Sequence, residues 1–232
     1  MTARSIRRHI DSLRGVLTDS ESAELDRLLQ KHDRATALAV HADSAVQTVA
    51  QTVTDSLPAD AGEADMIEAA AKVPTPASLK LVADRVARAS EREARNLVAG
   101  KRANLVQMFN AEFDAIRKEA AKVLPAVLPL ESASDAIRAG KSKEWARVED
   151  LYAEHQALRR EADSLRSDSL LPAYKGHDGY GTWKHPEPAP RYSELPEFRK
   201  FADDLRRESY VPADQAEVDR VRAADQEAAR VG

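Results

Sequence analysis

The sequence contains no cysteine, few aromatic residues and no long apolar run. Without cysteine the chain cannot form disulfides, use a thiolate nucleophile or hold a metal through sulfur. The most apolar stretch, residues 123–130, is short and contains Pro125 and Pro129, so we predict no membrane-spanning helix. Residues 1–17 lack the apolar segment of a standard secretory signal, and we expect a cytoplasmic protein.

Charge of neither sign dominates, because 35 lysine and arginine residues face 39 acidic residues and the formal net charge is −4. Strong nonspecific attraction to nucleic acid or to anionic membranes is therefore not expected from overall charge. Hydrophobic residues make up 43% of the chain and aromatic residues only 5%, with alanine supplying much of the apolar content. This composition predicts a folded, all-α protein whose helices pack closely through small side chains.

The sequence offers few residues for chemistry. Residues 175–181 (KGHDGYG) contain three glycines but lack the spacing of a dinucleotide-binding or phosphate-binding loop. His177, Asp178 and His185 are metal-ligand residue types, but their spacing matches no standard site and a surface loop is favoured. No nucleophile and base pair is recognisable. We therefore predict no enzymatic activity, cofactor or metal.

Helical periodicity is the main signal. The longest pattern runs from Thr75 to Leu124 and predicts one helix of about 70 Å, starting with Thr75 as N-cap and Pro76 in the first turn. Gly100 is expected to be a bend or a close contact. The apolar face of this helix is predicted at Leu79, Val82, Val86, Leu97, Leu105, Met108, Phe109, Phe113, Ile116, Ala120 and Val123.

Three helices are predicted ahead of the long one, of which the third is a short helix from about Glu63 to Val73. The first places Ile6, Ile10, Leu13 and Leu17 on one face. The second runs from about residue 18 to 57, with capping residues before it and Pro58 after it. Together with the long helix, these patterns favour an elongated helical bundle or coiled coil, which we expect to occupy residues 1–168.

The clearest heptad lies in the segment after Ser142. Alternating steps of three and four predict a helix-packing seam at Trp145, Val148, Leu151, His155, Leu158, Ala162 and Leu165. A histidine inside such a seam could sense pH or bind a ligand, but a partly buried histidine satisfied by a polar neighbour is the simpler interpretation.

Residues 169–232 differ in character and are predicted to form an extended C-terminal arm with short terminal helices. Residues 171–196 hold five of the 11 prolines and three of the eight glycines, and seven of the 11 aromatic residues follow Ser169. Aromatic side chains on a proline-stiffened segment suit docking into grooves. We consider two interpretations equally, binding to a partner subunit and packing on the same chain. The partner-binding candidates are Tyr174, Tyr180, Trp183, Tyr192, Phe198 and Phe201.

A row of arginines is the candidate for phosphate contact. Arg85, Arg88, Arg92, Arg95 and Arg102 align along one side of the predicted long helix. Asp84 and Glu91 precede Arg88 and Arg95 by four residues, a spacing that favours intrahelical ion pairs and a solvated face.

These observations favour a noncatalytic structural or assembly protein that works through self-association, with a homo-oligomer or larger assembly as its form. By analogy of architecture, and because residue usage suggests a GC-rich genome, a phage virion or assembly component fits this expectation. A bacterial coiled-coil adaptor or cytoskeletal protein, and a helical DNA-associated protein that uses the arginine row, are the alternatives.

Overall fold

The computed structural model describes residues 1–58, 62–174, 179–186 and 197–231. In these residues all regular secondary structure is helical, apart from an isolated antiparallel bridge between Trp183 and Ser209, so the all-α prediction is confirmed. None of the described helices is long and apolar enough to cross a bilayer. Contacts divide the chain into two compact units, which differ from the expected domains 1–168 and 169–232. Unit 1 comprises Met1–Ile10 and Leu17–Ala99, and unit 2 comprises Asp11–Val16 and Gly100–Gly232.

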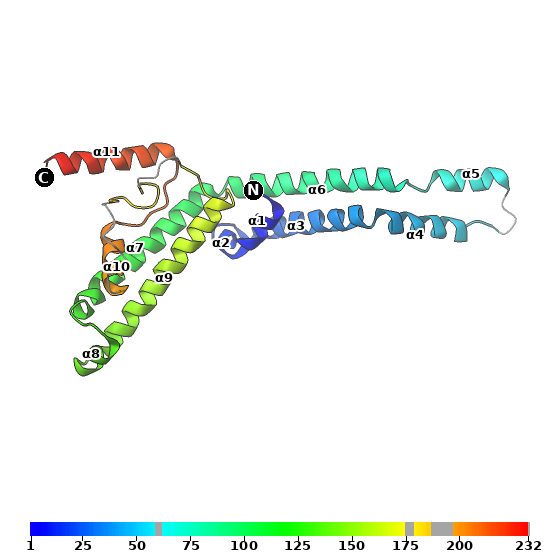
Figure 1. The fold of residues 1–232 in the computed structure, drawn as a ribbon. Helices are drawn as coiled ribbons and strands as arrows, with labels where there is room; N and C mark the ends of the chain where they lie inside the picture. Colours follow the sequence, from blue (N-terminus) through cyan, green and yellow to red (C-terminus); the bar gives the residue numbers. More distant parts are fainter. Residues whose placement is uncertain (59–61, 175–178, 187–196, 232) are drawn as a thin grey trace. The chain divides into compact units, whose positions relative to one another are not determined.

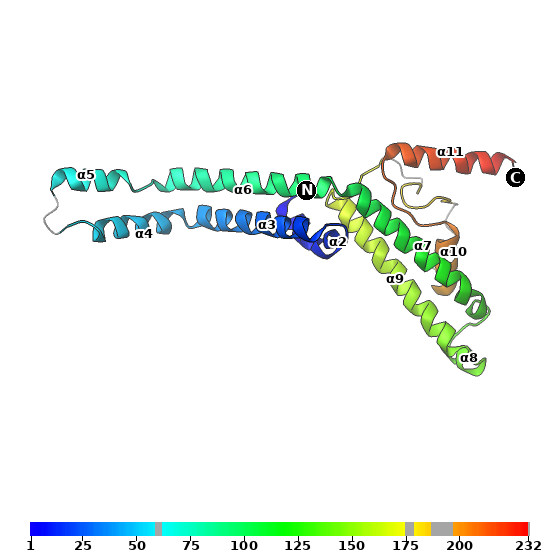
Figure 2. The ribbon, with the colours of Figure 1, turned by 180° about the vertical axis from the view of Figure 1, so that it is seen from behind.

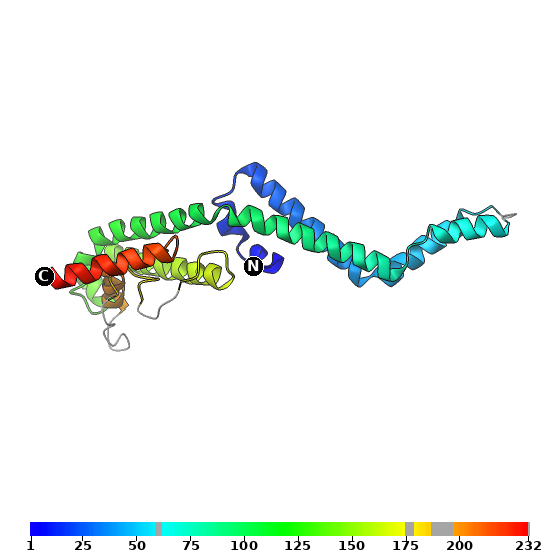
Figure 3. The ribbon, with the colours of Figure 1, turned by 90° about the horizontal axis from the view of Figure 1, so that it is seen from above.

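Unit 1 is a helical hairpin. Helices α3 and α4 run alongside α6 in the opposite direction, α5 lies next to α4 at the far end, and α1 packs on α6 (Figures 1 and 3). The bounds are α1 (Ala3–Arg8), α3 (Asp19–Val40), α4 (Ala42–Asp55), α5 (Glu63–Ala71) and α6 (Pro76–Ala99).

Two of the predicted helix starts are confirmed in atomic detail. The Thr18 hydroxyl accepts from the backbone N–H of Glu21, whose carboxylate accepts from Thr18 in return, which is a capping box at the start of α3. The Thr75 hydroxyl accepts from the backbone N–H of Ser78 at 3.1 Å, and Pro76 is the first residue of α6. Local sequence therefore positions these ends without help from the tertiary fold.

The predicted helix over residues 18–57 is interrupted at His41, which ends α3 and begins α4. The predicted first helix is likewise divided at His9, between α1 and α2 (Ile10–Arg14). Both histidines have backbone angles outside the α-helical range, with φ of −111° at His9, φ of −103° at His41 and ψ of 23° at both. Periodicity missed these breaks because a single non-helical residue barely disturbs the spacing of apolar side chains.

The interior of unit 1 is built from small side chains on α6. Ala83, Ser90, Ala94 and Val98 are its buried residues, whereas Val82 of the predicted apolar face is 56% exposed. The buried face is therefore rotated from the predicted one towards the smaller residues. Small side chains allow the backbones of α3 and α6 to approach closely, and the bulkier residues are left at the margin.

The predicted single helix from Thr75 to Leu124 is wrong. The structure has two helices, α6 and α7 (Arg102–Val127), with Gly100 and Lys101 in a turn between them. Glycine has little preference for the helix, and each helix buries its apolar face in a different unit, so continuity across Gly100 has no packing to support it. At the other end, α7 continues through Pro125, where the sequence predicted a break, because Leu124 and Val127 are both buried.

Unit 2 is built on the antiparallel pair of α7 and α9, which α8 connects and against which α10 packs (Figure 2). Gly140 closes the connection with φ of 67°, a left-handed conformation that favours glycine after a helix. The further bounds are α8 (Ala133–Arg138), α9 (Ser142–Ser167), α10 (Glu197–Arg206) and α11 (Gln215–Val231).

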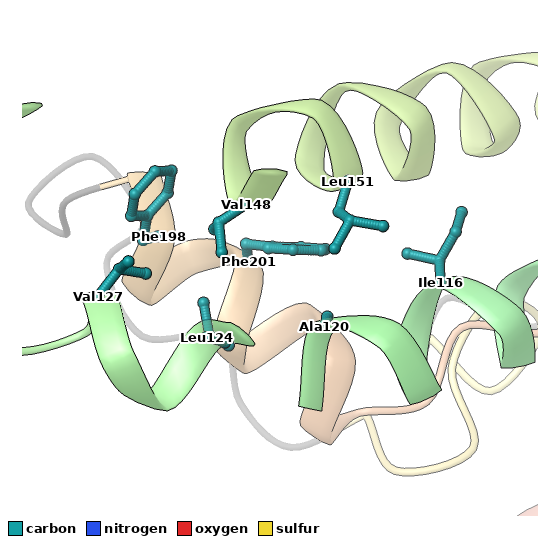
Figure 4. Packing of buried hydrophobic residues seen from close by; sticks show 8 residues of the cluster. All are labelled: Ile116, Ala120, Leu124, Val127, Val148, Leu151, Phe198 and Phe201. Atoms are coloured by element: carbon teal, nitrogen blue, oxygen red, sulfur yellow. The ribbon is translucent and has the colours of Figure 1, made fainter. Parts of the chain in front are cut away.

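The main core of unit 2 lies where three helices meet. Phe198 and Phe201 of α10 enter the space between α7 and α9 and complete a cluster of buried side chains (Figure 4). Phe201 is fully buried, and the Phe198 ring lies 4.5 Å from the Trp145 ring, centre to centre. The other members are Ile116, Ala120, Leu124, Val127, Val148 and Leu151. At these two aromatic residues the C-terminal segment is thus part of the core of its own chain, which is the second of the two interpretations considered from the sequence.

We expect Phe201→Ala to lower the free energy of unfolding of unit 2 by ~3–5 kcal/mol, because it removes a fully buried ring and leaves a cavity. Both tryptophans, Trp145 and Trp183, lie in unit 2, so urea unfolding followed by tryptophan fluorescence reports on this unit.

Ile137→Ala is the matched control, since Ile137 is an apolar residue of the same unit that is largely exposed, and a change within about 0.5 kcal/mol is expected. Equal stabilities of the two variants would contradict the packing of α10 in the core.

Candidate functional site

The predicted seam of α9 faces α7 and α10 of the same chain. Val148, Leu151, Ala162 and Leu165 are buried, and Trp145 and Leu158 are half-buried against the core cluster. The buried residues of the seam therefore pack on other helices of unit 2. The one polar member of the seam is His155, which is also buried.

His155 is 2% exposed and lies between two aromatic rings. The centres of the Phe113 and Phe201 rings are each 5.6 Å from the imidazole. Its Nε2 lies 3.0 Å from the Ser209 hydroxyl, while Nδ1 has no hydrogen-bond partner among the described residues. A proton on Nε2 leaves Nδ1 as a bare acceptor, which costs less than an unpaired buried donor. Burial, together with the nearby Arg159 guanidinium, lowers the pKa of His155 to about 4.

Three of the described aromatic residues of the arm lie against arginines of the same chain. The Arg159 guanidinium lies 4.0 Å from the centre of the Trp183 ring, and Arg166 lies 4.6 Å from that of Tyr174. Arg222 of α11 approaches the Tyr180 ring at 5.6 Å. Each of these cation–π contacts covers one face of the aromatic ring from within the same chain.

The assignment of arm aromatics to partner binding needs correction at two positions. Phe198 and Phe201 are buried in the core of unit 2, which corresponds to the intrasubunit interpretation. Sequence reasoning could not separate the two interpretations, because an aromatic residue after a proline-rich segment has the same pattern in either case. Tyr192 lies outside the described residues.

Asn110 of α7 fastens the segment that follows α10. Its side-chain amide donates to the carbonyl of Val211 at 3.0 Å and its side-chain carbonyl accepts from the Val211 N–H at 2.7 Å. Two residues earlier the chain pairs with residues 182–185, and the Tyr210 hydroxyl donates to the Tyr180 carbonyl at 2.6 Å. No sequence pattern pointed to Asn110, since a single half-buried asparagine on a helix has no spacing signal.

Of the three residues considered as metal-ligand types, His185 is described, whereas His177 and Asp178 lie outside the described residues. The Nδ1 of His185 lies 2.7 Å from the Asp225 carboxylate, which also accepts from the Tyr180 hydroxyl at 2.7 Å. The hydrogen bond from His185 lowers the pKa of Asp225. Within the described ranges no group of three or more His, Asp or Glu could hold a metal ion. These contacts link α11 to the rest of unit 2.

The arginine row is divided between the units. Arg85, Arg88, Arg92 and Arg95 are exposed on α6, whereas Arg102 begins α7 and donates to the Ser169 carbonyl at 2.9 Å. The predicted pair of Glu91 and Arg95 is formed at 3.3 Å. The predicted pair of Asp84 and Arg88 is not, so Arg85, Arg88 and Arg92 have no ion pair with another described residue.

Unit 1 also exposes large apolar side chains along its length. Leu81 is 53% exposed and lies beside Val82, which is exposed to a similar degree, on α6. Leu38 on α3 borders the same region. The remaining exposed apolar residues of the unit are Val40, Val49, Met66 and Ile67. A two-layer hairpin with a thin interior has no second face to cover them, and such surfaces are typical of interaction sites.

No protein-family model, curated protein or solved structure matches this chain. The candidate sites are therefore those that its own residues define.

We expect Asn110→Ala to destabilise the attachment of the segment around Val211 by ~1–3 kcal/mol, because it leaves a buried backbone N–H and carbonyl without partners. The measurement is hydrogen exchange of the Val211 amide, which should become faster. Asn104→Ala, on an exposed position of the same helix, should leave the exchange rate unchanged. Equal exchange in both variants would mean that Asn110 does not hold this segment.

His155 should make unit 2 less stable in acid. The unfolded chain binds a proton near pH 6.5, but the folded chain binds it only near pH 4, so stability is greatest above pH 6.5. Between these values the free energy of unfolding should fall by about 1.4 kcal/mol per pH unit, or ~3 kcal/mol in all.

The measurement is urea unfolding from pH 7 to 4, comparing wild type with His155→Gln, which removes the titrating group. The difference in stability between the two should change with pH over this range. The exposed His41 provides the control, since His41→Gln should run parallel to wild type. Parallel curves for wild type and His155→Gln would show that His155 does not stay neutral in the fold.

Proposed function

We propose that this chain is a noncatalytic structural or assembly protein that acts by self-association. The observation that carries the proposal is the set of large apolar side chains that unit 1 leaves exposed, centred on Leu81 and Val82 of α6. Burying such side chains in a second molecule is favourable by roughly 25 cal/mol per Å² of apolar surface. Because the hairpin cannot cover these side chains alone, it would be stabilised by packing against another helical surface.

Unit 2 supplies the rigid part of this arrangement. Its aromatic core and Asn110 hold α10 and the segment around Val211 on α7 and α9, and α11 is joined to Tyr180 and His185 through Asp225. Such a unit keeps its shape when it meets another molecule, so little ordering entropy opposes association. The arm therefore supports assembly by stiffening its own subunit, and the aromatic residues that are described act within it.

An assembly of this type suits a phage virion or assembly component located in the cytoplasm or the virion, and we keep that proposal on grounds of architecture and residue usage. A coiled-coil adaptor that binds a different protein is the second candidate. The exposed Arg85, Arg88 and Arg92, which lack ion-pair partners in the described chain, favour DNA association as a third.

We expect wild-type protein to have a mass above that of the monomer, rising with concentration, in light scattering after size exclusion. Leu81→Ser with Val82→Ser should lower that mass, because both side chains are more than half exposed in one subunit and become buried on association. Helicity and melting temperature at low concentration should stay as in wild type, since neither side chain belongs to the buried face of α6.

Ile137→Ser is the matched control, as Ile137 is exposed to a similar degree on unit 2, and it should leave the mass unchanged. A monomer at every concentration would overturn the self-association function in favour of an adaptor. Repeating the experiment with duplex DNA at low and high salt separates the third candidate, because binding through the arginine row would weaken steeply with salt.

A further inference from the structure

Unit 2 contains an apolar groove with an acidic rim. The groove lies along one side of α7 and α9, next to α2, and has a volume of about 750 Å³. Phe109, Ile116 and Leu158 contribute to its apolar floor, and the small residues Ala115 and Ala157 widen it. Its rim carries four carboxylates and no basic side chain lines it. The four are Asp11, Glu112, Glu154 and Glu161.

The negative charge of this acidic groove is only partly balanced within the chain. Glu154 forms an ion pair with Arg147 at 3.1 Å, and Glu161 accepts a hydrogen bond from the Ser12 hydroxyl at 2.8 Å. The carboxylates of Asp11 and Glu112 are exposed and have no partner among the described residues. A ligand that brings both apolar surface and positive charge would therefore satisfy the groove.

Unit 1 has a groove of the opposite kind. It lies between α3 and α6, has a volume of about 410 Å³, and its rim carries Arg27, Lys31 and Arg34 with no acidic lining residue. Arg27 is paired with Glu24, whose pKa is lowered mainly by the hydrogen bond from Arg27 and also by the charge of Lys31. Lys31 and Arg34 are exposed and form no ion pair within the described ranges. The apolar lining residues include Leu38 and Val82, which are also among the exposed large side chains of the unit.

The basic residues of this groove lie along one edge of α3, which we call the α3 edge. Lys31, Arg34 and Leu38 follow one another by three and four residues, so they lie on one face of α3. From Lys31 to Leu38 this face is seven residues long, about 10 Å at 1.5 Å per residue. On α9 the acidic groove extends from Glu154 to Glu161, which is also an interval of seven residues and therefore of equal length. Charge, apolar character and length therefore match between the two surfaces.

From this match we infer that the acidic groove of one copy receives the α3 edge of a second copy. Leu38 enters the apolar floor, and Lys31 and Arg34 meet the carboxylates of Asp11 and Glu112. A helix lying in the groove between two helices is a common mode of recognition, in which apolar anchors give affinity and charges set orientation. This inference rests on the proposed self-association and assigns the two surfaces that carry it.

The contact joins different surfaces on the two copies, so it is heterologous. After two copies have paired, one copy still has its α3 edge unoccupied and the other still has its acidic groove unoccupied, so further copies add at both ends. Such contacts produce a ring if the rotation between copies closes and a filament if it does not. The mass distribution of the wild-type protein, a single ring size or a rising series, distinguishes these two forms of the same contact.

Charge reversal tests the inference. Asp11→Lys with Glu112→Lys makes the groove basic, and Lys31→Glu with Arg34→Glu makes the α3 edge acidic. Each double variant alone should lose association, with an association constant lowered roughly ten- to a hundredfold, because like charges then face each other. An equimolar mixture should regain it, since the acidic groove of the second variant fits the basic edge of the first, and the reversed groove fits the reversed edge.

Two further double variants change the same charges elsewhere. Glu131→Lys with Asp150→Lys, and Lys118→Glu with Lys122→Glu, alter exposed positions of unit 2 outside the acidic groove and should associate as wild type does. Circular dichroism checks that all variants keep their helicity. Because Asp11 lies in the first turn of the short α2, Glu112→Lys alone serves as a second variant and should show a smaller loss in the same direction.

The outcomes separate this inference from the proposed function. Wild-type association that persists in both double variants would overturn the groove pairing and leave self-association standing. Loss in each variant without recovery in the mixture would also overturn the pairing, because the two surfaces would then act through other partners. A monomeric wild type would overturn both. Loss in each variant with recovery in the mixture is the expected result.

Discussion

The insertion of Phe198 and Phe201 between α7 and α9 is the packing on which unit 2 depends. Two helices alone bury only one stripe each, and the aromatic rings fill the remaining space with large apolar surface. Once α10 is held there, the segment around Val211 reaches Asn110, Ser209 reaches His155, and Trp183 reaches Arg159. The unit gains a core that its alanine-rich helices would not have formed alone.

Unit 1 is packed in the opposite way, through small side chains instead of large aromatic rings. Its helices approach closely because α6 presents alanine, serine and valine to α3, and this closeness moves the bulkier Leu81 and Val82 to the margin. The same choice that lets the hairpin pack leaves it with apolar surface to bury. This exposed apolar surface is the physical reason for which we propose self-association, because a neighbouring molecule that covered it would stabilise the hairpin.

The two units also differ in the charge that borders their grooves. Carboxylates border the apolar groove of unit 2, and lysine and arginine border that of unit 1, so a nearly neutral chain carries two surfaces of opposite sign. Overall charge gives no sign of this arrangement. Opposite surfaces on one chain favour contacts between copies in a fixed order, which is what a repeating assembly requires, and they disfavour contacts of either surface with itself.

Sequence alone determined the helical class, the caps at Thr18 and Thr75, and the heptad of α9, because each depends on residues within one or two turns of each other. The tertiary structure decided where the long pattern breaks, since a helix continues across Gly100 only if both halves share a core. It also decided that Phe198 and Phe201 lie inside their own unit, and that Asp11 joins Glu112 at one groove about a hundred residues away. These outcomes depend on which surfaces meet, and periodicity carries no information about the partner of a face.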